Sequence, residues 1–173
     1  GVMAQLYSVR SSDSWGIGDF RDIGYLGETL ANNGAGDFLL INPLHAAEPV
    51  APMTHSPYLP VTRRFVNPLY IRPENIPEVA RLSGPKRSLV QWAFEEVKDS
   101  DLSAEPIDRD AVWKAKREAL EVIFDAGPSR ARQRGLERFG AEQREGGDHL
   151  ERRAGRPAVA VGAWRERVAG GGH

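Results

Sequence analysis

Two loops of the sequence carry side chains suited to a neutral ligand rich in hydroxyl groups. Trp15 and Tyr58 each present a flat apolar face with a polar edge. Pro57 and Pro60 flank Tyr58 and stiffen its loop, which lowers the entropy lost when a ligand binds. Further groups for hydrogen bonds stand close by in the sequence: Ser56, Asn42, His45, His55 and Asn67. We therefore expect a site for a polyhydroxylated ligand.

Each candidate also has a structural interpretation that the sequence leaves open. Asp19 precedes an amphipathic segment and can cap a helix there. Trp15 can pack over the start of that helix, and His45 can be a hydrogen-bonded core residue at the end of a strand. Arg63 and Arg64 can hold a carboxylate on a ligand, or be solvated or paired with local acids. Tyr58, between two prolines, has the weakest structural explanation.

The sequence lacks the motifs of dinucleotide binding, metal binding and catalysis by a serine nucleophile. GIGD is not a dinucleotide fingerprint, because G-x-G-x-x-G does not follow the strand directly. No group of His, Asp and Glu has metal-ligand spacing, and no G-x-S-x-G motif occurs. We expect no metal and no cofactor.

The elements that must position these residues begin with a β-α-β unit. Residues 2–9 and 37–42 are predicted as parallel strands, because both are mostly apolar. Asp19 and Asp22 predict an acidic capping box for a helix that runs to about residue 31. Ligands of α/β folds lie at the carboxyl ends of the strands, which here lead into loops 10–19 and 43–70.

The remainder of the chain is predicted to be a long irregular connection followed by helices. Prolines exclude a central strand from 54–71, and the whole connection runs to about residue 78. Helices are expected over 87–99 and 108–125. Asp108 or Asp110 caps the second, Gly127-Pro128 ends it, and one face is apolar: Val112, Ala115, Ala119, Val122 and Ile123.

Composition limits the partners and the compartment. The 173 residues carry a formal net charge of −1 and no cysteine, so we expect no nucleic-acid partner and a reducing cytoplasm. No apolar run reaches the roughly 20 residues that cross a bilayer, and no signal peptide is evident, so we expect no membrane partner. Residues 144–173 are rich in Arg, Gly and Ala, which fits a flexible basic tail, out-of-frame sequence, or an arm that binds nucleic acid or another partner.

Three motifs, in order, are similar to one family. QLYSVRSSDSWGIGDF, DFLLINPLHA and SPYLPVTRRFVNPLYI closely resemble the opening of the catalytic barrel of the 4-alpha-glucanotransferases. These enzymes are the amylomaltases, or disproportionating enzymes, of glycoside hydrolase family seventy-seven. The resemblance runs from about residue 3 to 78 and continues more loosely to about residue 143.

The resemblance implies an α/β fold that is an incomplete (β/α)8 TIM barrel, together with activity on maltooligosaccharides and other α-1,4-glucans. The family cuts the glucan and transfers one segment to an acceptor by a retaining mechanism with carboxylates, and it needs no metal. Retention places two carboxyl groups about 5 Å apart. The motifs that hold the family's catalytic acids are absent here, so we assign no catalytic residue and expect the chain alone to be inactive.

The resemblance also assigns roles to single residues. Tyr58 matches the tyrosine that stacks on the sugar next to the cut bond, and Ser56 and Pro57 shape that subsite. The other matched positions lie in the first barrel loop, at the end of the second strand and at the close of the long loop: Asp19, Trp15, Asn42, His45 and Asn67.

These matches predict an organisation into three segments. Residues 1–78 begin the catalytic barrel, 79–143 are a helical insert, and 144–173 are an aberrant tail, disordered or out of frame. We expect a fragment that lacks sequence upstream, is frameshifted or misassembled near residue 144, and has the missing remainder of the barrel as a partner. The alternative hypotheses are a non-catalytic glucan-binding or interaction protein and another α-glucan-active barrel of the α-amylase type.

Overall fold

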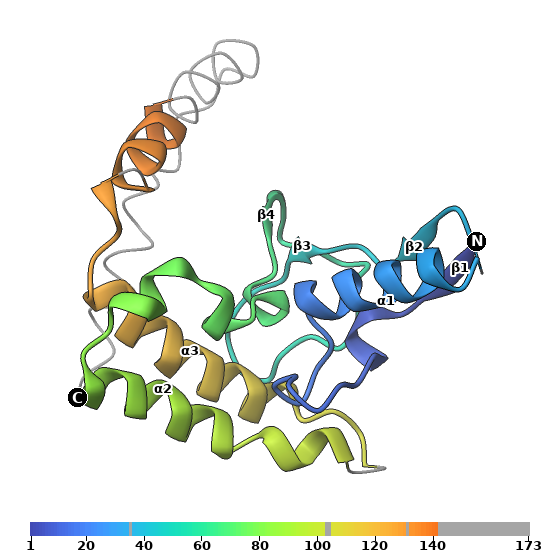
Figure 1. The fold of residues 1–173 in the computed structure, drawn as a ribbon, viewed down its shortest axis with the longest axis horizontal. Helices are drawn as coiled ribbons and strands as arrows, with labels where there is room; N and C mark the ends of the chain where they lie inside the picture. The colour runs from blue at the N-terminus through green and yellow to red at the C-terminus, as the bar shows by residue number, and fades with distance from the viewer. Residues whose placement is uncertain (35, 103–104, 131, 142–173) are drawn as a thin grey trace. The chain divides into compact units, whose positions relative to one another are not determined.

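The computed structural model describes residues 1–34, 36–102, 105–130 and 132–141. The chain divides into two compact units, Gly1–Gly127 and Pro128–His173. The first unit holds a β-α-β unit, a hairpin with several 3-10 turns, and a pair of helices (Figure 1). The fold is therefore a small α/β fold with short sheets.

The predicted β-α-β unit is present, with shorter strands than expected. β1 (Val2–Ala4) pairs in parallel with β2 (Leu39–Ile41), and Met3 lies opposite Leu40. The predicted strand over 2–9 is wrong beyond Ala4, because η1, a 3-10 turn at Leu6–Ser8, follows. A hydrogen bond from the Leu6 N–H to the side-chain oxygen of Asn42, at 2.7 Å, holds this turn in place.

Helix α1 (Phe20–Asn32) begins with the capping box that the sequence predicts. The Asp19 carboxylate accepts from the Arg21 N–H at 2.9 Å, and the Asp22 carboxylate accepts from the Asp19 N–H at 2.9 Å. The loop before the helix passes so close to η1 that a Cβ at Gly18 would overlap the Leu6 carbonyl oxygen. Glycine at position 18 therefore allows the chain to enter α1 against η1.

The long connection contains a hairpin that the sequence did not predict. β3 (His45–Ala46) pairs antiparallel with β4 (Thr62–Val66), with an irregular register between the two pairs of residues. The prolines stay outside both strands, as their missing N–H requires. Three 3-10 turns follow, each with proline at its start: η2 (Pro68–Tyr70), η3 (Pro73–Asn75) and η4 (Pro77–Arg81).

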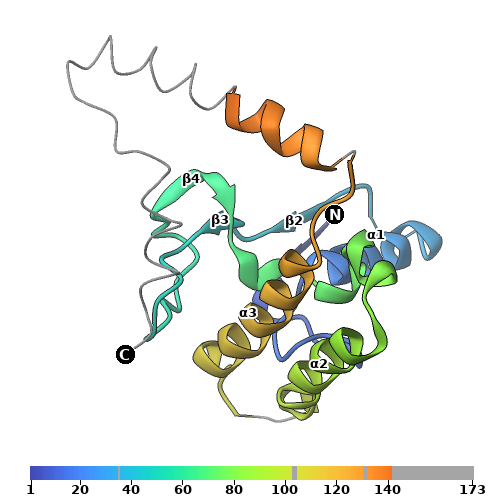
Figure 2. The ribbon, with the colours of Figure 1, turned by 90° about the vertical axis from the view of Figure 1, so that its left-hand side faces the viewer.

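Helices α2 (Gly84–Glu95) and α3 (Arg109–Asp125) lie side by side in both views of the ribbon (Figures 1 and 2). α2 begins earlier than the predicted 87, with Pro85 in its first turn, a position where proline is favoured. The 3-10 segment η5 (Lys98–Leu102) follows it. α3 has the predicted bounds within one residue, and Gly127, with φ of 80°, ends it as expected.

One core crosses the boundary predicted at residue 78. Trp15, from the loop between η1 and α1, is fully buried against the helix pair, with its ring 5.5 Å from that of Phe94. The buried members of this cluster come from both sides of that boundary: Trp15, Leu82, Val90, Ala93, Val97, Ala115, Ala119 and Ile123. Segments 1–78 and 79–127 therefore form one compact unit.

The cap of α3 gives a first prediction. The Asp108 carboxylate accepts from the N–H groups of Asp110 at 3.1 Å and Ala111 at 2.9 Å. Replacing Asp108 with alanine is expected to lower the free energy of unfolding by about 1 kcal/mol, because both N–H groups lose their acceptor. Urea denaturation measures this loss. Asp108→Asn keeps a side-chain oxygen that can accept the two N–H groups, so it serves as the control. Equal stability of the alanine variant and the wild type would contradict the prediction.

In the second unit, residues 132–141 are helical. The predicted tail over 144–173 lies outside the described residues.

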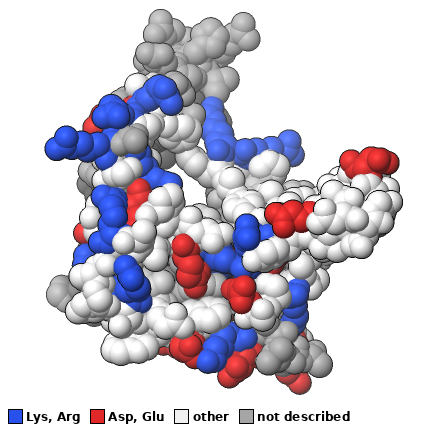
Figure 3. Space-filling view, viewed as in Figure 1, with Lys and Arg blue, Asp and Glu red and all other residues white. Residues whose placement is uncertain are grey.

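Within the described part of the chain, no helix is both long and apolar enough to span a membrane. On the face drawn in Figure 3, basic and acidic side chains are interspersed.

Candidate functional site

The candidate site begins where the two parallel strands end. Gln5 follows β1 and Asn42 follows β2, so both side chains lie at the carboxyl edge of the sheet. Asn42 is buried, accepts from the Leu6 N–H at 2.7 Å, and donates to the Tyr70 hydroxyl at 3.0 Å. Burial raises the pKa of the Tyr70 phenol, and the hydrogen bond from Asn42 opposes that rise. Asn42 thus joins η1 to η2 and has little surface left for a ligand.

Tyr58 stands exposed beside this edge. Its side chain is 58% exposed, and its hydroxyl accepts from the Gln5 amide at 3.5 Å. The Tyr58 N–H donates to the Ser56 hydroxyl at 3.3 Å, which gives the loop a local turn. An aromatic ring held by its backbone and open to solvent is a suitable stacking surface.

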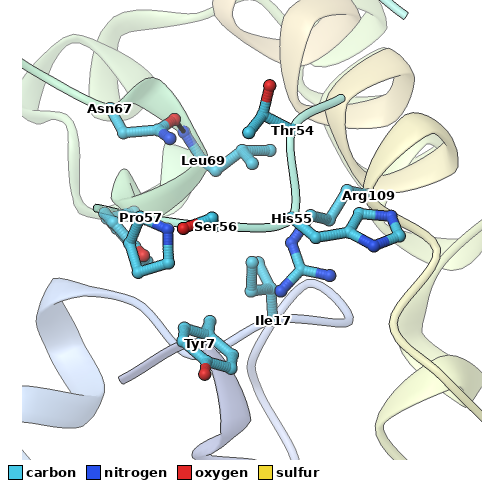
Figure 4. Close-up of a pocket in the computed structure, with 10 residues that line it drawn as sticks. Tyr7, Ile17, Thr54, His55, Ser56, Pro57, Asn67, Leu69 and Arg109 are labelled. Atoms are coloured by element: carbon cyan, nitrogen blue, oxygen red, sulfur yellow. Dashed lines mark hydrogen bonds between the residues drawn. The ribbon is translucent and has the colours of Figure 1, made fainter. Parts of the chain in front are cut away.

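A small hollow lies next to the Ser56-Pro57 segment (Figure 4). Its volume of about 10 Å3 holds roughly one water molecule. A larger ligand would therefore lie across the mouth of the hollow. The lining combines neutral hydrogen-bonding and aromatic groups with one guanidinium: Tyr7, Ile17, Thr54, His55, Ser56, Pro57, Asn67, Leu69, Tyr70 and Arg109.

The remaining predicted site residues divide into those at the hollow and those elsewhere. Asn67 lines the hollow, and its side chain caps η2 by accepting from the Leu69 N–H at 3.0 Å. His45 lies in β3 and is half-buried, and it does not line the hollow. Of the eight predicted substrate contacts, Ser56, Pro57 and Asn67 line the hollow.

Asp19 and Trp15 have the structural roles that the sequence left open. Both are fully buried. Asp19 caps α1 and pairs with the guanidinium of Arg72 at 2.8 Å, while Asp22 pairs with the same guanidinium at 3.0 Å. The Trp15 indole N–H donates to both carboxylate oxygens of Glu74 at 3.0 Å. Neither side chain lines the hollow.

Helix α3 contributes to the site, which the sequence analysis missed. Arg109, the first residue of α3, lines the hollow, and its guanidinium carbon lies 5.3 Å from the centroid of the Tyr7 ring. The same helix holds the loop, because the Asp110 carboxylate accepts from the Met53 N–H at 2.7 Å and the Trp113 indole donates to the Pro49 carbonyl at 3.0 Å. The run IDRD marks the start of this helix, and nothing in it indicates a site more than 50 residues away.

The groups that line the hollow can form hydrogen bonds and aromatic contacts with a ligand. None of the residues lining the hollow is a carboxylate, so the hollow has no pair of acids for a retaining mechanism. Among the described residues, no group of three or more His, Cys, Asp and Glu could hold a metal ion.

Comparisons with known proteins agree with one another. The sequence model described as 4-alpha-glucanotransferase matches residues 4–154, which extends past residue 143. A 4-alpha-glucanotransferase of Mycobacterium tuberculosis is 44% identical over 142 residues, covering 77% of this chain and 19% of that protein. One of Haemophilus influenzae is 40% identical over 129 residues, covering 72% and 18%.

A solved structure gives the same result. The crystal structure of amylomaltase from Corynebacterium glutamicum superposes with a TM-score of 0.75 at 43% identity, over 93% of this chain and 24% of that chain. The chain spans about a fifth of the length of the curated relatives that it matches.

Proposed function

The chain belongs to the 4-alpha-glucanotransferase family, and from that membership we propose that it is the amino-terminal part of a (β/α)8 barrel that transfers segments of α-1,4-glucans. In this proposal the chain supplies a sugar-binding surface, and the acids that cut the bond belong to later barrel strands. The observation that carries the proposal is the exposed Tyr58 ring at the carboxyl edge of the parallel strands. Active sites of barrels lie at that edge.

Three features of the loop support a role in glucan binding. Tyr58 offers a ring face for stacking, and Ser56 and Asn67 offer hydrogen bonds at the hollow beside it. The hollow itself is too small for a glucose ring, which favours a glucan lying along the surface. We propose that this surface binds α-1,4-glucans. In this proposal four residues support the surface without lining the hollow: Asp19, Trp15, Asn42 and His45.

A chimera tests the proposed transferase function. Residues 4–143 replace the matching segment of the amylomaltase from Corynebacterium glutamicum, and the purified protein is incubated with maltotriose. We expect glucose and longer maltooligosaccharides to appear. A chimera that melts at the temperature of the parent enzyme and forms no products would contradict the proposal.

Tyr58 provides the second prediction, made in the same chimera. Tyr58→Ala is expected to lower kcat/KM for maltotriose by about two- to tenfold, because a stacked aromatic contact contributes about 0.5–1.5 kcal/mol. Tyr25→Ala, which removes another exposed tyrosine ring from α1 (38% exposed, against 58% for Tyr58), should leave kcat/KM unchanged. Equal losses in both variants would show that Tyr58 has no specific contact with the glucan.

A further inference from the structure

Arg109 is a cation in the candidate site, and no carboxylate in the described part of the chain pairs with it. Within the described ranges, its guanidinium forms no ion pair and no side-chain hydrogen bond, and its contact is the Tyr7 ring at 5.3 Å. Arg72, by contrast, pairs with two carboxylates. The N–H groups of Arg109 are therefore available to a ligand.

The position of Arg109 is set by its neighbours in the chain. Asp108 caps α3 with its side chain, and Asp110 is bound to the Met53 N–H, so the backbone on both sides of Arg109 is fixed. The guanidinium lies over the Tyr7 ring, and an arginine in such a cation–π contact keeps N–H groups for hydrogen bonds. In Figure 4 the guanidinium extends past His55 toward Ile17 and Tyr7.

The surroundings of the guanidinium favour a neutral hydroxylated ligand. The polar groups that share the hollow are neutral donors and acceptors such as Thr54, Ser56 and Asn67. Adjacent hydroxyl groups of a glucose unit can accept two N–H groups of one guanidinium, and such charge-assisted hydrogen bonds are stronger than neutral ones.

We propose that Arg109 contacts the glucan, donating hydrogen bonds to hydroxyl groups of a glucose unit that lies across the mouth of the hollow next to residues 54–58. The proposal rests on the proposed function and adds a specificity-determining residue to the same site. It also makes the helical segment after residue 78 a part of the binding surface, with Tyr7 positioning the guanidinium.

Calorimetric titration of the full chain with maltoheptaose tests the proposal. Arg109→Ala should weaken binding by about tenfold or more, and Arg109→Lys, which keeps the charge and loses the fork, should weaken it less. Arg117→Ala, on the exposed face of α3, serves as control and should bind as the wild type does. Thermal melting of each variant confirms that it is folded.

The outcomes separate the two proposals. Binding that is weakened by Tyr58→Ala and unchanged by Arg109→Ala would overturn the role of Arg109 alone. A wild-type chain that binds no maltoheptaose would overturn both the role of Arg109 and the glucan-binding surface. Competition by inorganic phosphate at equal concentration would identify a site for anions and overturn the hydroxyl contact.

Chemical modification gives a readout that a structural role would not change. Phenylglyoxal reacts with accessible guanidinium groups, and peptide mapping measures the modified fraction at each arginine. Maltoheptaose should protect Arg109 and leave Arg117 as reactive as before. Equal modification of Arg109 with and without the glucan would overturn the proposal.

Discussion

Replacing Arg72 with methionine is expected to lower the free energy of unfolding by about 3 kcal/mol, the lower end of the range for breaking a buried ion pair. Arg72 is buried and holds the carboxylates of Asp19 and Asp22, both of which are fully buried. Methionine fills much of the same volume, so the loss reflects the two charges left without a partner. Backbone N–H groups still bound to both carboxylates keep the cost at that lower end.

The control for Arg72 is the exposed ion pair of α3. Arg117 lies 3.5 Å from Glu121, and both side chains are more than half exposed. Arg117→Met should therefore change the free energy of unfolding by less than about 0.5 kcal/mol. Urea denaturation at pH 7 compares the two variants. Similar values for both would show that the buried pairs contribute no more than a surface pair.

The second large effect concerns Lys116 and pH. Lys116 is fully buried, and its ammonium donates to the carbonyl oxygens of Leu69 at 2.6 Å and Ile71 at 3.0 Å. Burial lowers the pKa of Lys116 to about 8, against about 10.4 in an unfolded chain. Between these values the unfolded chain binds the proton and the folded chain releases it, so stability must rise with pH.

We expect the free energy of unfolding to rise by up to about 3 kcal/mol between pH 8 and 10.4 from this group. Below pH 8 both states are protonated and the cost of burying the charge is fully present. The raised pKa of the Tyr70 phenol acts in the opposite sense above about pH 10, so the measurement runs from pH 7 to 10.

Two variants show whether Lys116 causes the rise of the free energy of unfolding with pH. Lys116→Met should remove the rise with pH, although it also leaves the two carbonyl oxygens without that donor. Lys114→Met, which removes an exposed lysine paired with Glu96, should keep the rise. Guanidinium chloride denaturation at several pH values measures all three proteins. A rise that persists in Lys116→Met would show that another group causes it.

Local signals in the sequence predict much of the fold. α1 follows from Asp19 and Asp22 in a capping box, and α3 follows from Asp108 and its apolar face, because these signals lie within one or two turns. The 3-10 turn after Ala4 and the β3–β4 hairpin depend on distant partners, such as Asn42 for Leu6. Such partners leave no local pattern.

The site shows the same division. The sequence indicates Tyr58, Ser56 and Pro57 because prolines and an aromatic ring occur together in one loop. Lys116 and Arg72 are charged residue types that are mostly exposed in proteins, and only the tertiary structure shows that both are buried. Lys116 occupies the buried face of α3 beside Ala115 and Ala119, where apolar periodicity alone would place a hydrophobic residue. Arg109 reaches the hollow through tertiary packing that a linear pattern does not encode.

The two bonds from α3 to the connection before the site have a consequence for protein engineering. Asp110 and Trp113 hold Met53 and Pro49, so a helix encoded more than 50 residues later fixes the residues that lead into Tyr58. Transplanting residues 43–70 alone into another protein would move the aromatic ring without its two anchors on α3. Loop and helix therefore form one structural unit, and we expect substitutions at the start of α3 to shift the position of Tyr58 while the loop sequence stays unchanged.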